Sequence, residues 1–198
     1  MQGEDKLAQD VRILSTMADE MENYLDSDVL FWHIAQGGMP VLTLGGYLMR
    51  QHRLLALYDS LSAEQRVEVD QAVAKFNQAL EERTVRFEQK AHRELDARLR
   101  QWQEYLNDLE REQASVKSNY ATVVEARAMI AALTDYLQMA PYQLEDRVLQ
   151  RTALLDGRLR PRWETGEFVW PEGLQEAYPP SEYWWLYGAP RERPNNFT

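Results

Sequence analysis

The chain has 198 residues, of which 44% are hydrophobic and 27% are charged, a balance typical of a folded globular domain and not of a disordered chain. Its formal net charge of -10 disfavours nucleic acid or an anionic membrane as the main partner, because both are bound through an excess of Lys and Arg. Since the chain contains no cysteine, disulfides, thiolate metal sites and cysteine nucleophiles are excluded, which fits a cytoplasmic location.

The first segment with helical periodicity covers residues 4–26. Apolar side chains recur there at steps of three and four, the spacing of one face of a helix; they are Leu7, Val11, Leu14, Ala18, Met21 and Leu25. Acidic residues occupy the opening turn, where they interact favourably with the helix dipole. The N-terminal residues lack the basic start and the apolar stretch of a secretory signal. We therefore expect an amphipathic helix that packs its apolar face against the rest of the protein.

An uncharged run of 21 residues follows, from Val29 to Met49. It is long enough to cross a membrane as a helix, but four glycines, Pro40 and several polar residues dilute its apolar character. The sequence "GGMP" would also break a spanning helix near its middle. The run has neither the glycine spacing nor the Lys-Ser/Thr ending of a phosphate-binding loop. We therefore expect a turn inside the folded protein.

Around this glycine-rich turn we predict two helical segments. The first ends at Gly37, since glycine is the preferred residue just after a helix, and Pro40 helps to turn the chain. The second covers residues 43–59 and has Gly45 and Gly46 in its first turn, where the missing side chains let another backbone approach closely.

The most informative pattern is an apolar stripe between residues 62 and 112. It opens with a capping box, in which Ser62 and Gln65 satisfy each other's backbone N–H groups. The stripe has a mean step of about 3.6 residues and consists of Val69, Val73, Phe76, Leu80, Thr84, Phe87, Ala91, Leu95, Leu99, Trp102, Leu106 and Leu109, with no Gly or Pro between them. One helix of about 50 residues would be roughly 75 Å long, whereas a compact domain of this chain length is only about 40 Å across. We therefore predict a projecting helix.

A second stripe, between residues 119 and 160, offers the partner that such a helix needs. It consists of Tyr120, Val123, Ala126, Ile130, Leu133 and Leu137, then Leu144, Val148, Thr152, Leu155 and Leu159, with a boundary at Pro141. Because the two stripes have similar lengths, we predict an antiparallel helical hairpin over residues 62–160 with its tip at 113–119. The tip contains neither Gly nor Pro, so a continuous helix through it is the alternative.

The C-terminal segment, residues 161–198, changes character. It holds six of the eight prolines and four of the six tryptophans. This density of proline forbids a long helix, while the aromatic content is too high for a disordered linker. One interpretation is that the aromatic side chains cap the open end of the helical bundle; the other is that they form a partner-binding surface, since Trp and Tyr anchor many interfaces. The candidate partner-binding residues are Trp170, Tyr183, Trp184, Trp185 and Tyr187.

Common catalytic and metal-binding motifs are absent from the sequence. It contains no G-x-S-x-G, S-x-x-K or H-E-x-x-H, and none of its three histidines follows the Glu-x-x-His pattern of di-iron bundles. We therefore assign no catalytic residue, no metal ligand and no cofactor.

Four residues near the glycine-rich turn form a candidate ligand site: His33, Arg50, His52 and Arg53. If the two predicted helices around the turn pack together, imidazole and guanidinium groups converge there on a small anionic molecule. The alternative is structural, with a partly buried histidine bonded to a backbone carbonyl and the arginines paired with acids of the 4–26 helix.

Together these patterns predict an all-α protein: an elongated antiparallel helical hairpin, two further helices packed at its base, and an irregular aromatic, proline-rich C-terminal tail. We expect a single helical domain over residues 1–198, with base helices and turn (1–61), hairpin (62–160) and tail (161–198). A projecting shape without a catalytic motif favours a non-enzymatic protein-protein interaction or scaffold protein, which binds a protein partner or associates with itself as a homodimer. Neither nucleic acid nor a membrane is expected as a partner. The alternative is a small anionic ligand-binding or metal-binding protein, or a hydrolase, with its site at the glycine-rich turn.

Overall fold

The computed structural model describes residues 2–111 and 119–191 and confirms the prediction of an all-α protein. Most of the described residues belong to α1 (Gln2–Asp19), α2 (Met21–Asp26), α3 (Leu44–Ala56), α4 (Ala63–Glu82), α5 (Thr84–Glu110), α6 (Tyr120–Leu137) and α7 (Asp146–Leu159). Short 3-10 helices lie at η1 (Tyr58–Ser60), η2 (Arg160–Arg162), η3 (Glu172–Ala177) and η4 (Trp184–Leu186). A small antiparallel sheet pairs β1 (Trp163–Phe168) with β2 (Tyr187–Pro190).

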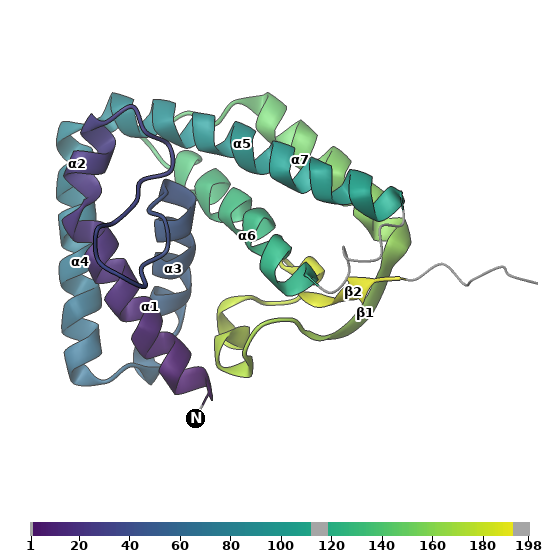
Figure 1. The fold of residues 1–198 in the computed structure, drawn as a ribbon, viewed down its shortest axis with the longest axis horizontal. Helices are drawn as coiled ribbons and strands as arrows, with labels where there is room; N and C mark the ends of the chain where they lie inside the picture. Colours follow the sequence, from purple (N-terminus) through teal and green to yellow (C-terminus); the bar gives the residue numbers. More distant parts are fainter. Residues whose placement is uncertain (1, 112–118, 192–198) are drawn as a thin grey trace, which may run out of the picture.

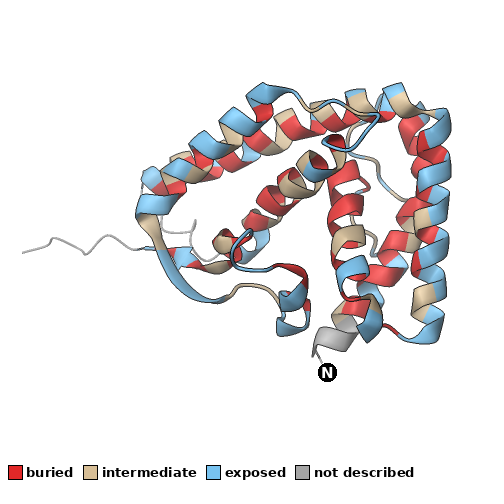
Figure 2. Cartoon of the chain, turned by 180° about the vertical axis from the view of Figure 1, so that it is seen from behind, coloured by how far each residue is buried: buried red, intermediate tan, exposed pale blue. Residues whose placement is uncertain are grey.

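The helices form two arms that meet where α4 ends and α5 begins (Figure 1). In one arm, α1 packs against α4 and α3; in the other, α5 packs against α6 and α7. Helix α3 also contacts α6, so the buried side chains of both arms belong to one continuous core. Figure 2 shows that buried residues line the faces that the helices turn toward one another, while exposed residues cover the outer faces.

The predicted antiparallel hairpin is present as α5 and α6, but its predicted returning arm over 119–160 is too long, because α7 turns back and does not continue α6. Near its tip, Tyr120 of α6 packs against Trp102 and Tyr105 of α5, with ring centroids 6.4 and 6.0 Å apart. At the far end, Tyr136 packs against Phe87 at 5.3 Å. The two alternatives for the tip itself fall on residues 112–118, which lie outside the described residues.

Helix α7 runs beside α5 in the same direction, after the predicted boundary near Pro141. Polar contacts join successive turns of the two helices at Asp96–Arg147 (2.8 Å), Gln103–Arg151 (3.0 Å) and Glu110–Arg158 (3.0 Å). Below these contacts, α7 buries Val148, Leu155 and Leu159. The outgoing helix α5 therefore has two helical partners, and the apolar stripe is covered by both.

The prediction of one uninterrupted helix over residues 62–112 is wrong, because the chain bends at Arg83. Helix α4 ends at Glu82 and α5 begins at Thr84. Between them, Arg83 adopts φ −131° and ψ 30°, outside the helical region. The projecting rod is therefore replaced by two helices that run in different directions, with α4 packed against α1 (Figure 1).

The bend brings together aromatic side chains that a straight helix would hold apart. Phe76 in α4 and Phe87 in α5 would lie about 16 Å apart along a straight helix, yet their ring centroids are 6.1 Å apart. Both rings pack against Tyr136 of α6, at 5.8 and 5.3 Å. Burial of these rings in one cluster offsets the helical hydrogen bonds that are lost at the bend.

The predicted helical segment ending at Gly37 is also wrong, because residues 27–43 form a loop. Trp32 and Leu42 make an isolated antiparallel bridge, with N–H to O distances of 3.1 and 2.8 Å. Gly38 turns the chain between them with φ +78°, a conformation that favours glycine. The loop thus folds back on itself where a helix was expected.

A buried lysine explains why this segment is stable without helical hydrogen bonds. Lys90 of α5 is only 3% exposed, and its ammonium group donates to the carbonyl oxygens of Tyr24, Ser27 and Val29 at 2.7 to 2.8 Å. Each of these carbonyls lies in or beyond the last turn of α2, where the helix no longer supplies backbone N–H groups as hydrogen-bond partners. The lysine therefore holds the start of the loop against α5, a contact between segments more than sixty residues apart.

Helix α3 confirms the predicted start near residue 43 and the close approach at its glycines. The Thr43 side chain accepts a hydrogen bond from the Gly46 N–H at 3.0 Å. Gly45 donates its N–H to the buried carboxylate of Glu94 in α5, also at 3.0 Å. A Cβ atom on Gly45 would lie 2.9 Å from the Cβ of Met129 in α6, closer than real Cβ contacts. The predicted capping box before α4 is present as well.

The C-terminal tail contains, besides the irregular segments expected, the β1–β2 sheet. Trp163 pairs with Pro190 and Phe168 with Tyr187, and the register is irregular between Thr165 and Phe168. Gly188 allows this pairing, because at φ +138° a Cβ there would lie 2.0 Å from the carbonyl oxygen of Glu164. The sheet and η3 then place the tail across α1, α3 and the N-terminal end of α6.

Candidate functional site

The four residues predicted near the glycine-rich turn do not converge on one point. His33 is exposed on the loop, one residue from the Trp32–Leu42 bridge and hence beside the start of α3. His52 is eight residues beyond Leu44, about 12 Å farther along α3. Among the described residues, no hydrogen bond or ring contact joins the two histidines.

Both predicted arginines point toward α1 and pair with one buried carboxylate. Asp10 has no exposed surface. Arg53 donates to it at 2.9 Å, and the Arg50 Nε atom lies 3.5 Å away. Arg50 also donates to the carbonyl oxygen of Gly46 at 2.8 Å. Burial lowers the pKa of Arg50, and the neighbouring Arg53 charge adds to that effect. The single carboxylate of Asp10 therefore pairs with both guanidinium groups and neutralises one of their two positive charges.

His52 is held by the tail. Its Nε2 atom lies 2.9 Å from the carbonyl oxygen of Ala177 in η3, and its ring packs against Tyr178 and Tyr183, with centroids 5.3 and 5.7 Å away. Since a carbonyl oxygen only accepts, Nε2 carries the hydrogen in this bond. The structural interpretation of the histidine and the arginines is therefore confirmed, while a ligand-binding role for these residues stays a prediction.

The tail aromatics cap the bundle, as one of the two interpretations predicted. Tyr183 and Trp185 are 6% and 1% exposed. Tyr120 of α6 donates to the carbonyl oxygen of Trp185 at 2.6 Å, and Trp170 donates its indole N–H to the carbonyl oxygen of Ala121 at 2.8 Å. The remaining candidates, Trp170, Trp184 and Tyr187, are half-buried. A partner-binding role of these aromatics stays a prediction, and only the half-buried three present surface for it.

A hollow of about 430 Å³ opens beside two of these half-buried aromatics. It lies between the end of the β1–β2 sheet and η3, and we call it the tail hollow. Its lining residues are Gly166, Glu167, Phe168, Trp170, Glu172, Gln175 and Tyr187. Its volume falls within the range of typical small-ligand sites, about 300–1,000 Å³.

The three aromatic rings of the tail hollow differ in orientation. Phe168 and Trp170 are nearly perpendicular, at 83° with centroids 6.2 Å apart, and Phe168 and Tyr187 are tilted by 49° at 5.2 Å. Behind them lies the buried ring of Tyr178, 5.2 Å from Trp170 and 6.4 Å from Phe168. A ligand in the hollow therefore meets ring faces and edges from several directions.

Inward hydrogen bonds hold two of these rings in place. The Trp170 indole donates to Ala121, and the Tyr187 hydroxyl donates to the carbonyl oxygen of Tyr178 at 2.7 Å. Desolvation raises the pKa of Tyr187, so its hydroxyl remains neutral and able to donate at physiological pH. Because the polar ends of both side chains point into the protein, their apolar surfaces remain for contact.

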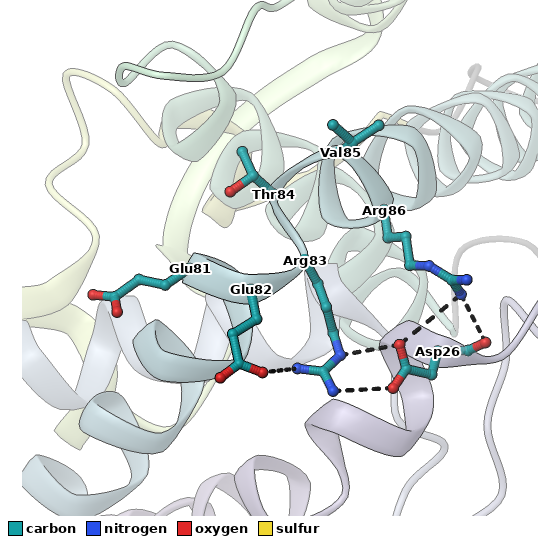
Figure 3. A pocket seen from close by; sticks show the side chains of 7 residues that line it. All are labelled: Asp26, Glu81, Glu82, Arg83, Thr84, Val85 and Arg86. Carbon is teal, nitrogen blue, oxygen red and sulfur yellow. Dashed lines mark hydrogen bonds and ion pairs between the residues drawn. The ribbon is translucent and has the colours of Figure 1, made fainter.

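A second hollow, also of about 430 Å³, lies at the bend between α4 and α5 (Figure 3). Arg83 donates to both carboxylate oxygens of Asp26 at 3.0 Å and to Glu82 at 3.1 Å, and Arg86 donates to the carbonyl oxygen of Asp26 at 2.9 Å. The Arg83 guanidinium lowers the pKa of Asp26. These contacts of Arg83 and Arg86 link α2 to the bend between α4 and α5.

The sequence pointed to part of the tail hollow. Trp170 and Tyr187 were among the predicted partner-binding residues, whereas Phe168 and the two acids, Glu167 and Glu172, were missed. The signal was the short segment "GEFVWPEG", in which acids flank aromatic residues. Nothing in the neighbouring sequence links this segment to Tyr187, because Tyr187 is placed beside it only by the pairing of β1 with β2.

Within residues 2–111 and 119–191, no group of three or more His, Asp or Glu side chains is arranged to hold a metal ion. None of the described helices combines the length and the apolar character needed to span a membrane. No protein-family model, curated protein or solved structure shows significant similarity to the chain.

Proposed function

We propose that this protein is a non-enzymatic protein-interaction module that uses the tail hollow as its contact site. The observation that carries the proposal is a hollow of about 430 Å³ walled by three aromatic side chains and built on a packed helical base. Tyr and Trp are enriched among the residues that contribute most to binding at protein interfaces. The cysteine-free sequence supports the expectation that the module acts in the cytoplasm.

The site is preorganised for binding. Trp170 and Tyr187 are fixed by hydrogen bonds to backbone carbonyls, and Phe168 packs on the buried ring of Tyr178. Side chains that are already ordered lose little rotamer freedom when a partner binds, which would otherwise cost about 0.5–1.5 kcal/mol for each. The contacts that a partner makes with the aromatic wall therefore contribute to the binding free energy with little loss of side-chain entropy.

Site-specific photo-crosslinking tests the proposal. A photoreactive p-benzoylphenylalanine at Gln175, an exposed residue that lines the hollow, is expected to capture one discrete protein in extracts of the organism's own cells, or a second copy of the chain. The matched control carries the same group at Val67, which is 54% exposed on α4 and does not line the hollow. Equal capture at both positions would contradict the proposal.

A pair of tryptophan variants sharpens this test. Trp170→Ala removes a wall of the hollow and should abolish capture at Gln175. Trp184→Ala truncates a second half-buried tryptophan of the same tail, outside the hollow, and should leave capture unchanged. Far-ultraviolet circular dichroism establishes that both variants retain the helical fold. Undiminished capture by Trp170→Ala would show that the hollow is not the contact.

A further inference from the structure

We infer that the tail hollow binds a cationic side chain, arginine or lysine, from a basic peptide segment of the partner. This inference rests on the proposed function and adds the chemistry of the ligand. It depends on three features of the hollow: the signs of its charges, the orientation of its rings and its size.

The lining of the hollow carries negative charge alone. Glu167 and Glu172 are acidic, and none of the seven lining residues is basic. Within the described residues, neither carboxylate takes part in an ion pair, in contrast to Asp26 at the α4–α5 bend and Asp10 in the core. The chain as a whole carries a net charge of -10. A cation entering the hollow is therefore attracted at long range and meets carboxylates that form no ion pair with the other described residues.

The aromatic walls favour the same kind of ligand. The face of an aromatic ring is negative, so it attracts an ammonium or guanidinium group within about 6 Å of its centre. Phe168, Trp170 and Tyr187 present rings at different angles around one space, and the indole is the strongest cation-binding ring of the three. Rings alone would accept any apolar side chain, whereas rings together with two carboxylates select for a positively charged one.

The size of the hollow limits what enters it. A volume of about 430 Å³ accommodates one long side chain with its neighbouring backbone, and is too small for a whole helix or folded domain. The alkyl stem of Lys or Arg can cover the apolar ring surface while the charged end reaches a carboxylate at the rim. The ligand is thus a peptide segment that inserts one cationic residue.

The test uses short peptides of defined charge and the full-length protein. The probes are capped Gly-Gly-X-Gly-Gly peptides, in which X is arginine, lysine or citrulline, the neutral counterpart of arginine. Binding is followed by nuclear magnetic resonance through the Trp170 indole N–H signal, which a Trp170→Phe variant assigns. The arginine and lysine peptides should shift this signal in a saturable way and bind at least about tenfold more tightly than the citrulline peptide. Their affinity should fall as salt is added.

Two double variants with the same change in net charge distinguish the effect of the hollow's own carboxylates from the electrostatic field of the whole protein. Glu167→Gln with Glu172→Gln removes the carboxylates of the hollow, and we expect the affinity for the cationic peptides to fall by about tenfold or more. Glu164→Gln with Glu176→Gln removes two exposed acids of β1 and η3 that do not line the hollow, and should change the affinity less than about twofold.

The outcomes distinguish this inference from the proposed function. Equal binding of the citrulline peptide, no saturable shift with any cationic peptide, or equal losses in the two double variants would overturn the cationic ligand. The interaction module would still stand if Gln175 crosslinking persisted in those cases and remained sensitive to Trp170→Ala. If crosslinking ignores Trp170→Ala, the proposed function fails irrespective of the peptide results.

Discussion

Replacing Gly45 with alanine tests whether α3 and α6 approach as closely as the structure shows. The added Cβ would lie 2.9 Å from the Cβ of Met129 and 2.8 Å from Oε1 of Glu94. Ordinary contacts between carbon atoms are about 3.5–4.0 Å, so the Met129 contact requires a shift of roughly 0.6 Å or more. Because a Cβ atom is attached directly to the backbone, this shift must separate the two helices. Glu94 cannot retreat without stretching its hydrogen bond to the Gly45 N–H.

The expected cost follows from two opposing effects. Overpacking of a filled core typically costs about 1–3 kcal/mol, while alanine gains up to about 1 kcal/mol over glycine in a helix interior, and less in the first turn. We therefore expect Gly45→Ala to lower the free energy of unfolding by about 1–2 kcal/mol, equivalent to a decrease in Tm of roughly 2–8 °C for a chain of this size.

Gly157→Ala is the matched control. Gly157 lies inside α7, and a Cβ there would meet no heavy atom within 4 Å. The same substitution should therefore raise the free energy of unfolding by about 0.5–1 kcal/mol. Urea unfolding followed by circular dichroism measures both values. If Gly45→Ala proves as stable as Gly157→Ala, the close contact between α3 and α6 does not exist.

Three further predictions concern buried charge, alkaline pH and the bend. Asp10→Asn should cost about 3–5 kcal/mol in urea unfolding, because it leaves Arg53 buried without its carboxylate; a loss under about 1 kcal/mol would refute this. Burial raises the pKa of Tyr178 to about 12 from 10.0, so the stability it confers is complete below pH 10 and is lost as the pH rises toward 12, at about 1.4 kcal/mol per pH unit. Tyr178→Phe should remove that part of the slope, and an unchanged slope would contradict the assignment. At the bend, Phe87→Ala should lower the free energy of unfolding by about 3–5 kcal/mol and Arg83→Ala by less than about 1 kcal/mol. A larger loss for Arg83→Ala than for Phe87→Ala would show that ion pairs, and not the aromatic cluster, maintain the bend.

Several features of the fold were predictable because they depend on neighbours in the sequence. The capping box at Ser62 and the cap at Thr43 need only residues within one turn of the helix. The 3.6-residue period of the second stripe likewise predicted α6 and α7, and the stripe covering α5 predicted its pairing with α6. Such signals are local, so the all-α class and most of the helical segments follow from the sequence alone.

The bend and the loop could not be predicted in this way. No Gly or Pro marks Arg83, and the chain bends there because Phe76, Phe87 and a ring of α6 are more stable together than apart. The loop after α2 depends on Lys90, which lies outside the apolar stripe and is therefore not marked for burial by the sequence pattern. In both cases side chains from distant segments stabilise a backbone that local propensity does not favour.

The candidate site shows the same division. From the aromatic composition we predicted that the tail either caps the bundle or binds a partner, and Trp170 and Tyr187 were among the predicted partner-binding residues. Whether such rings are buried or presented depends on which segments cover them, and β-pairing between Phe168 and Tyr187 created the hollow. Likewise, Arg50 and Arg53 are paired inside the protein because α1 brings Asp10 to them. The sequence by itself determined most of the helical segments and the chemical character of the tail. The tertiary structure decided which of the described charges and rings are paired or buried, because burial and pairing are set by segments far apart along the chain.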